Sequence, residues 1–149
     1  MRRFFLEMLQ WIKQRLKSEK AAHLKSGTWG ERQAARLLRK SGYKICGKNV
    51  RVGRHDELDI VAEQRGTIVF VEVKTRRNED FGRPISAVNK EKRKRLSRAA
   101  INYLRDRKLR PDHIRFDVVE VIGEPGGAAP EIRHIENAFP LDSAYRLWW

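Results

Sequence analysis

The stretch from Ile68 to Arg76, IVFVEVKTR, limits the fold most strongly, because it is an apolar run that contains a carboxylate and an ammonium group. β-Branched and aromatic residues at this density are typical of a strand buried on both faces. Side chains alternate between the two faces of a strand, so Phe70, Glu72 and Lys74 share one face. An apolar face that ends in an acid and a base indicates either a functional site or an ion pair.

The remaining periodicities predict one α/β domain with a mixed sheet flanked by helices. Strands are expected over residues 43–52, 57–63, 67–75 and 115–121, a short edge strand over 131–135, and helices over 29–41 and 87–108. Three successive strands form a meander, and the second of these helices then crosses over to a strand that adds in parallel. We expect residues 27–139 to form this domain, residues 1–26 to be a helical extension, and residues 140–149 to be an aromatic tail.

The extension has the pattern of a basic amphipathic helix. Apolar residues recur in it at helical spacing, and basic residues fill most of the positions between them. The apolar residues are Phe4, Phe5, Met8, Leu9, Ile12 and Leu16. Such a helix packs on its own domain or on a partner chain, lies on an anionic membrane surface through residues 1–17, or contacts nucleic acid. The sequence leaves these alternatives open, and no apolar run approaches the roughly 18–20 residues that cross a bilayer.

Charge is distributed unevenly along the chain. The 149 residues carry a net charge of +14, which favours an anionic partner such as nucleic acid or an acidic membrane surface. Residues 74–110 hold fourteen basic and four acidic side chains, whereas residues 111–149 hold three basic and seven acidic ones. The anionic partner is therefore expected to meet the middle of the chain. The single cysteine, Cys46, is typical of a protein in the reducing cytoplasm.

The turn between the second and third strands brings a second carboxylate to Glu72. A two-residue loop at Arg65-Gly66 places Asp59 directly across from Glu72, on the same face. Two close carboxylates repel each other unless a cation lies between them. Lys74 supplies one positive charge, and Mg²⁺ or Mn²⁺ is the stronger candidate, because one or two carboxylates with water and substrate phosphate are its usual ligands. Such an ion activates water, and Lys74 can neutralise developing charge. A structural salt-bridge ladder is the alternative.

Glu31 is a third candidate acid. It falls on the apolar face of the helix expected over residues 29–41, so its carboxylate can point toward the hairpin. Thr28-Trp29-Gly30-Glu31 also matches the capping box T-x-x-E, in which the glutamate serves the start of the helix. Both readings remain open at this point.

The pattern Asp59-x12-Glu72-Val73-Lys74 resembles the D…(D/E)-x-K core of the PD-(D/E)XK nuclease superfamily. The fuller pattern is similar to that of the uncharacterised bacterial YraN family, and extends over about residues 27–139. The matching blocks are Gly30-Glu31…Ala35…Leu38, Glu57-Leu58-Asp59-Ile60, Phe70 to Arg76, Ala87-Val88…Lys92…Leu96…Ala100…Tyr103-Leu104, Arg115 to Val119, and Ile135…Ala138-Phe139. One departure is His55-Asp56, where the family pattern has two glycines.

This resemblance implies a restriction-endonuclease-like fold and a Mg²⁺-dependent phosphodiesterase that acts on DNA. Carried over by position, Asp59, Glu72 and the Val73 carbonyl are metal ligands, Lys74 is the catalytic lysine, and Glu31 is the helical acid. The family is similar in turn to archaeal Holliday-junction resolvases. That similarity implies branched DNA, or repair and recombination intermediates, as substrates, and a homodimer.

The basic residues that follow the strand predict contacts with phosphate groups. Arg76, Arg83 and Lys92 are the best candidates, because the run from Lys92 to Arg95 points to all sides of a helix. Contacts of this kind give affinity without reading a base sequence. A protein that binds nucleic acid through a nuclease-like fold without cutting it is the alternative function.

Overall fold

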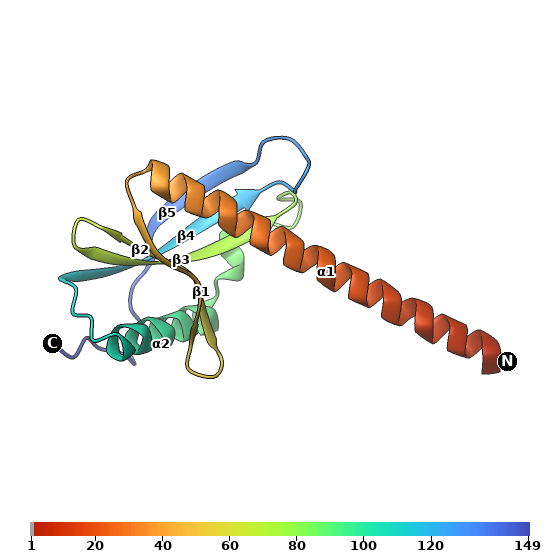
Figure 1. The fold of residues 1–149 in the computed structure, drawn as a ribbon, viewed down its shortest axis with the longest axis horizontal. Helices are drawn as coiled ribbons and strands as arrows, with labels where there is room; N and C mark the ends of the chain where they lie inside the picture. Colours follow the sequence, from red (N-terminus) through yellow and green to blue (C-terminus); the bar gives the residue numbers. More distant parts are fainter. Residues whose placement is uncertain (1) are drawn as a thin grey trace.

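The computed structural model describes residues 2–149, which form a five-stranded sheet between two helices (Figure 1). In chain order the elements are α1 (Arg2–Lys40), β1 (Lys44–Val52), β2 (Asp56–Gln64), β3 (Thr67–Arg76), the 3₁₀ helix η1 (Pro84–Ala87), α2 (Lys90–Asp106), β4 (His113–Ile122) and β5 (Glu131–Phe139). None of the helices formed by these residues is long and apolar enough to cross a membrane.

The sheet has the strand order β1-β2-β3-β4-β5, with β3 and β4 parallel and the other neighbours antiparallel. This is the predicted meander followed by a helical crossover. The α/β class, the mixed sheet and the restriction-endonuclease-like arrangement are therefore confirmed.

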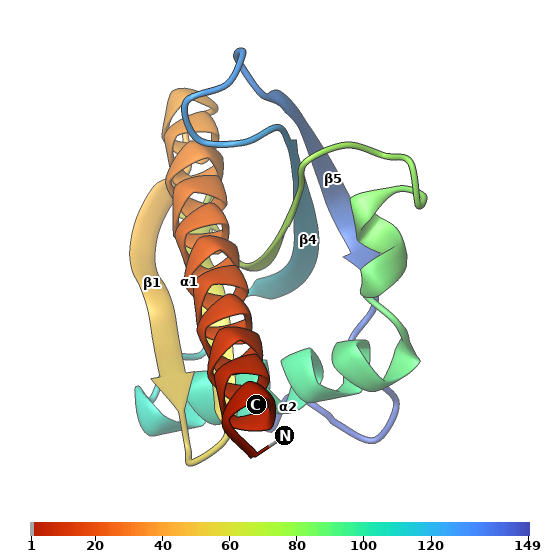
Figure 2. The ribbon, with the colours of Figure 1, turned by 90° about the vertical axis from the view of Figure 1, so that its right-hand side faces the viewer.

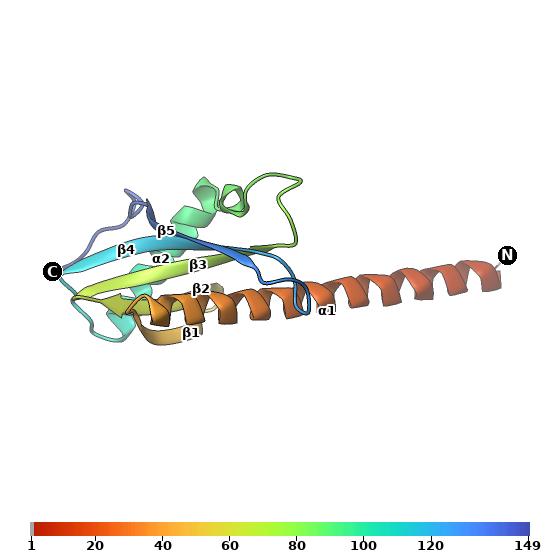
Figure 3. The same ribbon diagram turned by 90° about the horizontal axis from the view of Figure 1, so that it is seen from above.

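Each face of the sheet is covered by one helix, α1 on one side and α2 on the other (Figures 2 and 3). On the α2 face, Leu104 and Ala100 pack with Phe70 and Phe116. On the α1 face, Leu38 packs with residues of β3 that point away from α2, such as Val69 and Val71. The continuous apolar run of β3 is explained by this two-sided burial.

The helical extension expected over residues 1–26 and the helix expected over 29–41 are continuous, because α1 runs from Arg2 to Lys40 as one helix. Glycine and serine cost a helix only about 1 kcal/mol or less relative to alanine, so one such pair does not end a long helix. The capping-box reading of residues 28–31, one of the two left open, is wrong. Thr28 lies inside the helix, and its hydroxyl donates to the carbonyl of Leu24 at 3.0 Å.

Two further boundaries differ from the prediction. Helix α2 begins at Lys90, since Asn89 caps it by accepting a hydrogen bond from the Lys92 N–H at 2.9 Å, and residues 84–87 form η1. Strand β5 continues to Phe139, well beyond the predicted end at residue 135. The buried Asp117 carboxylate helps to hold this longer strand by accepting from the Asn137 N–H at 2.9 Å.

The C-terminal tail lies against the domain. Leu141 and Leu147 pack on the core between the sheet and α2, and the indole of Trp149 donates to the carbonyl of Pro111 at 3.2 Å. The tail therefore covers the end of α2 that lies far from the candidate site.

Candidate active site

The candidate site lies where β2 and β3 separate. Their ladder pairs run from Gln64 with Thr67 to Ile60 with Val71, which is the register that the sequence predicts. Asp59 and Glu72 are the next residues on each strand. In place of a further ladder bond, the Asp59 carboxylate accepts a hydrogen bond from the Val73 N–H at 2.8 Å.

The Asp59 side chain is half-buried, and its surroundings shift the pKa of its carboxyl. Burial, followed by the negative charge of Glu72, raises the pKa of Asp59 to about 7, although the hydrogen bond from Val73 opposes the shift. The carboxyl is therefore close to half-protonated at neutral pH without a further cation.

Glu72 is 3% exposed, and its two carboxylate oxygens have different surroundings. Its Oε1 atom lies 3.1 Å from the ammonium of Lys74 and 3.2 Å from that of Lys92 on α2. Its Oε2 atom is buried and has no hydrogen-bond partner among the residues that the structure describes. A buried carboxylate oxygen without a partner is costly, and it normally indicates a water molecule or an ion.

Glu31 reaches the same place from α1. Burial raises the pKa of its carboxyl, and the charges of Glu57 and Glu72 act in the same direction against Asn49 and Lys48. The helix can come this close because Gly30 has no side chain. A Cβ atom built on Gly30 would lie 1.9 Å from the Thr75 hydroxyl oxygen.

These groups line a pocket of about 460 Å³. Its wall is formed by His23, Leu24, Ser26, Gly27, Thr28 and Glu31 of α1, Asn49 of β1, Glu57 and Asp59 of β2, Glu72 to Arg76 of β3, and Lys92 of α2. All five residues predicted as catalytic or as metal ligands are therefore neighbours around one opening. Glu57 of β2 is exposed at its rim.

The residues suit a metal that needs few protein ligands. Within residues 2–149, no three side chains from His, Cys, Asp and Glu are close enough together to hold an ion by themselves. Two carboxylates and a backbone carbonyl, from Asp59, Glu72 and Val73, are nonetheless the donors that Mg²⁺ accepts, with water and phosphate filling the remaining positions. The unpartnered Oε2 of Glu72 offers one such position.

The three predicted phosphate contacts lie in different places. Arg76 is exposed beside the pocket, where it can meet a substrate. Arg83 instead holds the buried Glu120 at 2.6 Å, and Lys92 is engaged with Glu72. Burial would raise the pKa of Glu120, but the bonds from Arg83 and from the Ile85 N–H hold it below its ordinary value.

The role of Lys92 as a neighbour of Glu72 was missed. Its position five residues beyond Ala87 gave no signal of this, because the contact depends on how α2 crosses the sheet. His55, which departs from the family pattern, lies exposed in the turn before β2.

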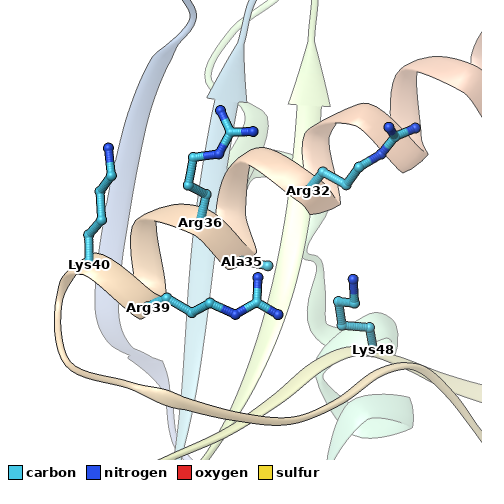
Figure 4. A pocket seen from close by; sticks show the side chains of 6 residues that line it. All are labelled: Arg32, Ala35, Arg36, Arg39, Lys40 and Lys48. Carbon is cyan, nitrogen blue, oxygen red and sulfur yellow. The ribbon is translucent and has the colours of Figure 1, made fainter.

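A second pocket, of about 370 Å³, lies on the other flank of α1 and is strongly basic (Figure 4). It is lined by Arg32, Ala35, Arg36, Arg39 and Lys40 of α1 and Lys48 of β1. The charge of Lys48 also opposes the rise in the pKa of the Glu31 carboxyl. The sequence prediction placed the basic surface after β3 and overlooked this one.

Comparisons with known proteins agree with the resemblance seen in the sequence. The sequence model of the uncharacterised protein family UPF0102 matches residues 30–121, a range that contains Glu31, Asp59, Glu72, Lys74 and Lys92.

The chain is also similar to individual members of that family. A UPF0102 protein of Syntrophomonas wolfei is 49% identical over 113 residues, which are 76% of this chain and 96% of that protein. UPF0102 protein STH1475 of Symbiobacterium thermophilum is 47% identical over 76% of this chain and 94% of its own length. A UPF0102 protein of Persephonella marina is 35% identical over 91% of this chain and 99% of its own length. The chain therefore belongs to the uncharacterised protein family UPF0102.

Proposed function

We propose that this protein is a metal-dependent nuclease that hydrolyses phosphodiester bonds in DNA. The observation that carries the proposal is the buried Glu72 carboxylate, which has two lysines on one oxygen and no partner for the other within residues 2–149. The buried oxygens of structural ion pairs normally have hydrogen-bond partners, so an unpartnered one favours a site that binds a cation.

Asp59, Glu72 and the Val73 carbonyl would hold the ion. When bound, Mg²⁺ or Mn²⁺ supplies Lewis acidity and lowers the pKa of a bound water. Lys74 lies beside Glu72 at 3.1 Å, where its ammonium can orient the attacking water and neutralise charge on the phosphoryl oxygens.

Glu31 and Lys92 complete the chemistry from the two helices. The Glu31 carboxyl, with its raised pKa, can exchange a proton with the attacking or leaving oxygen more readily than an exposed glutamate. Lys92 holds Glu72 from the opposite side to the strand and keeps its carboxylate turned toward the pocket.

The basic pocket on α1 favours nucleic acid as the substrate. Four cationic side chains of α1 and one of β1 line a hollow next to the candidate site, and Arg76 is exposed beside that site. Contacts of this kind bind a phosphate backbone without reading bases, so recognition by the shape of the DNA fits best. Branched DNA from repair or recombination is our proposed substrate class.

The test is a titration with Mg²⁺ or Mn²⁺ that follows metal binding and cleavage together on linear, single-stranded and four-way-junction DNA. We expect Glu72→Gln to lose metal binding and at least about 10²-fold in cleavage rate. Glu63→Gln, at the other end of the same hairpin, is the matched control and keeps both. Equal cleavage by wild type and Glu72→Gln would remove the proposed role of this carboxylate.

One observation favours a second candidate function, a nucleic-acid-binding protein without catalysis. Lys74 and Lys92 both lie beside Oε1 of Glu72 and compensate its charge, which is also what a structural ion-pair network would do. The same experiment separates the two functions. DNA binding that persists in every metal condition, with no cut in any substrate, assigns the binding role.

A further inference from the structure

The outer half of α1 exposes an unusual amount of apolar surface. The helix continues far beyond the edge of the sheet (Figures 1 and 3). Its exposed large apolar side chains are Phe4, Phe5, Leu6, Met8, Trp11, Ile12, Leu16 and Leu24. The UPF0102 match begins at residue 30, so this segment lies outside the part of the chain that defines the family.

Most of these side chains lie on one side of the helix. At about 100° per residue, six of them, together with the partly buried Leu9, fall within a sector roughly 160° wide. We call this set the apolar stripe: Phe4, Phe5, Met8, Leu9, Trp11, Ile12 and Leu16. Leu6 points away from it, among the cationic residues. The stripe is wider than the narrow seam by which two helices pair in a coiled coil.

The rest of the helix surface is polar and mainly cationic, and the Arg15–Glu19 ion pair lies within the sector of the apolar stripe. Residues 1–25 contain seven basic and two acidic residues. Both acids are engaged on the helix itself, Glu7 with Arg3 at 3.3 Å and Glu19 with Arg15 at 3.1 Å. Lys13, Lys17 and Lys20 have no acidic neighbour one turn away in the sequence. On a helical wheel they lie beside the edge of the stripe that Leu9 and Leu16 form.

These features distinguish between three occupants of the stripe. A second copy of this helix would bring like charges together at the flanks, where pairing helices need opposite ones. A nucleic acid would meet the lysines but would leave the aromatic and aliphatic side chains in water. An anionic lipid surface satisfies both, because acyl chains cover the stripe while headgroups meet the lysines.

We propose that residues 4–20 of α1 lie in the surface of an anionic phospholipid bilayer, with the apolar stripe inserted and the lysines at the headgroups. This proposal does not depend on the nuclease activity. It does place the candidate site near lipid, because α1 continues without a break into the pocket wall. Leu16 and Glu31 are roughly 22 Å apart along the helix, at about 1.5 Å per residue.

The test is flotation of the full chain with vesicles of phosphatidylcholine containing phosphatidylglycerol, and with vesicles of phosphatidylcholine alone. Leu16 and Leu6 provide a matched pair, since each is 59% exposed, one within the stripe and one outside it. We expect Leu16→Glu to lower partitioning into the anionic vesicles at least about tenfold, because a leucine that inserts among the acyl chains is replaced by a charge. Leu6→Glu, with the same change in charge, should lower it no more than about threefold.

Three results would overturn the proposal. Wild type that does not float with the anionic vesicles has no affinity for them. Equal losses in Leu16→Glu and Leu6→Glu would show that charge alone, without insertion, causes the binding. A lipid-free dimer, measured by light scattering, that dissociates in Leu16→Glu only would assign the stripe to a second copy of this chain.

Discussion

At the scale of single residues, the candidate site is held together by charges that the fold brings out of water. Asp59 shows this most clearly. Its pKa of about 7 means that the folded protein binds a proton more tightly than the unfolded chain does. The free energy of unfolding of the metal-free protein is therefore expected to fall as the pH rises from about 4 to about 7.

Asp59→Asn tests this effect, because the amide cannot ionise. In buffers with a metal chelator, we expect the variant to lose most of the decrease in unfolding free energy between pH 5 and pH 8. The gain at pH 8 is at most about 4 kcal/mol from a shift of this size. Urea denaturation at the two pH values measures it. An identical slope in both proteins would contradict the raised pKa.

Lys92 offers a second prediction at this scale. Lys92→Met removes one of the two ammonium groups on a carboxylate that is 3% exposed, so the free energy of unfolding should fall by about 1–2 kcal/mol. Lys94→Met, an exposed position on the same helix, is the control and should change it by less than about 0.5 kcal/mol. Thermal unfolding of both variants compares them, and equal effects would mean that the contact with Glu72 is energetically unimportant.

At the scale of elements, the close approach of α1 to β3 depends on one glycine. In Gly30→Ala the new methyl would meet Thr75, whose hydroxyl oxygen would lie at 1.9 Å and whose Cβ would lie at 3.0 Å. The helix must then move away from the strand, at a cost of about 1–3 kcal/mol that exceeds the gain in helix propensity. Glu31 moves with it, so cleavage should also decline.

Gly27→Ala is the matched control, because a Cβ atom there has no neighbour within 4 Å. Alanine is the better helix former, so this variant should be more stable than wild type by about 0.5–1 kcal/mol. Opposite signs for the two substitutions in denaturant unfolding support the close contact. Stabilisation by both would show that α1 and β3 are not in contact at Gly30.

The elements themselves were largely predictable, and the exceptions have local causes. The two-residue turn at Arg65-Gly66 fixed the register that places Asp59 and Glu72 side by side. The continuity of α1 was not predicted, because Ser26 and Gly27 look like a boundary although their energetic cost to a helix is small. Lys92 was missed because its contact with Glu72 is set by how α2 crosses the sheet, which no short-range pattern contains. The basic pocket did have a signal in the sequence, because Arg32, Arg36 and Arg39 recur at helical spacing.

At the scale of the whole molecule, positive charge gathers near the candidate site. If the basic pocket binds DNA, the double variant Arg32→Gln/Arg36→Gln should lower the slope of log affinity against log salt by about 2, one for each lost phosphate contact. Lys108→Gln/Arg110→Gln changes the net charge by the same amount. These residues lie next to the N-terminal ends of β3 and β4, away from the candidate site near the C-terminal end of β3, so this variant should leave the slope nearly unchanged. Fluorescence anisotropy with a four-way junction measures both slopes. Equal slopes in the two variants would assign the binding to net charge alone.

Because α1 is one uninterrupted helix, the apolar stripe and the pocket wall have a fixed rotation relative to each other about the helix axis. Each residue added between Leu16 and Glu31 turns one end by about 100° relative to the other, and seven residues return it to within about 20° of the original phase. The number of residues between Leu16 and Glu31 therefore determines which side of the domain faces the surface that the stripe binds. A single inserted alanine would leave both ends intact and direct the opening of the pocket elsewhere.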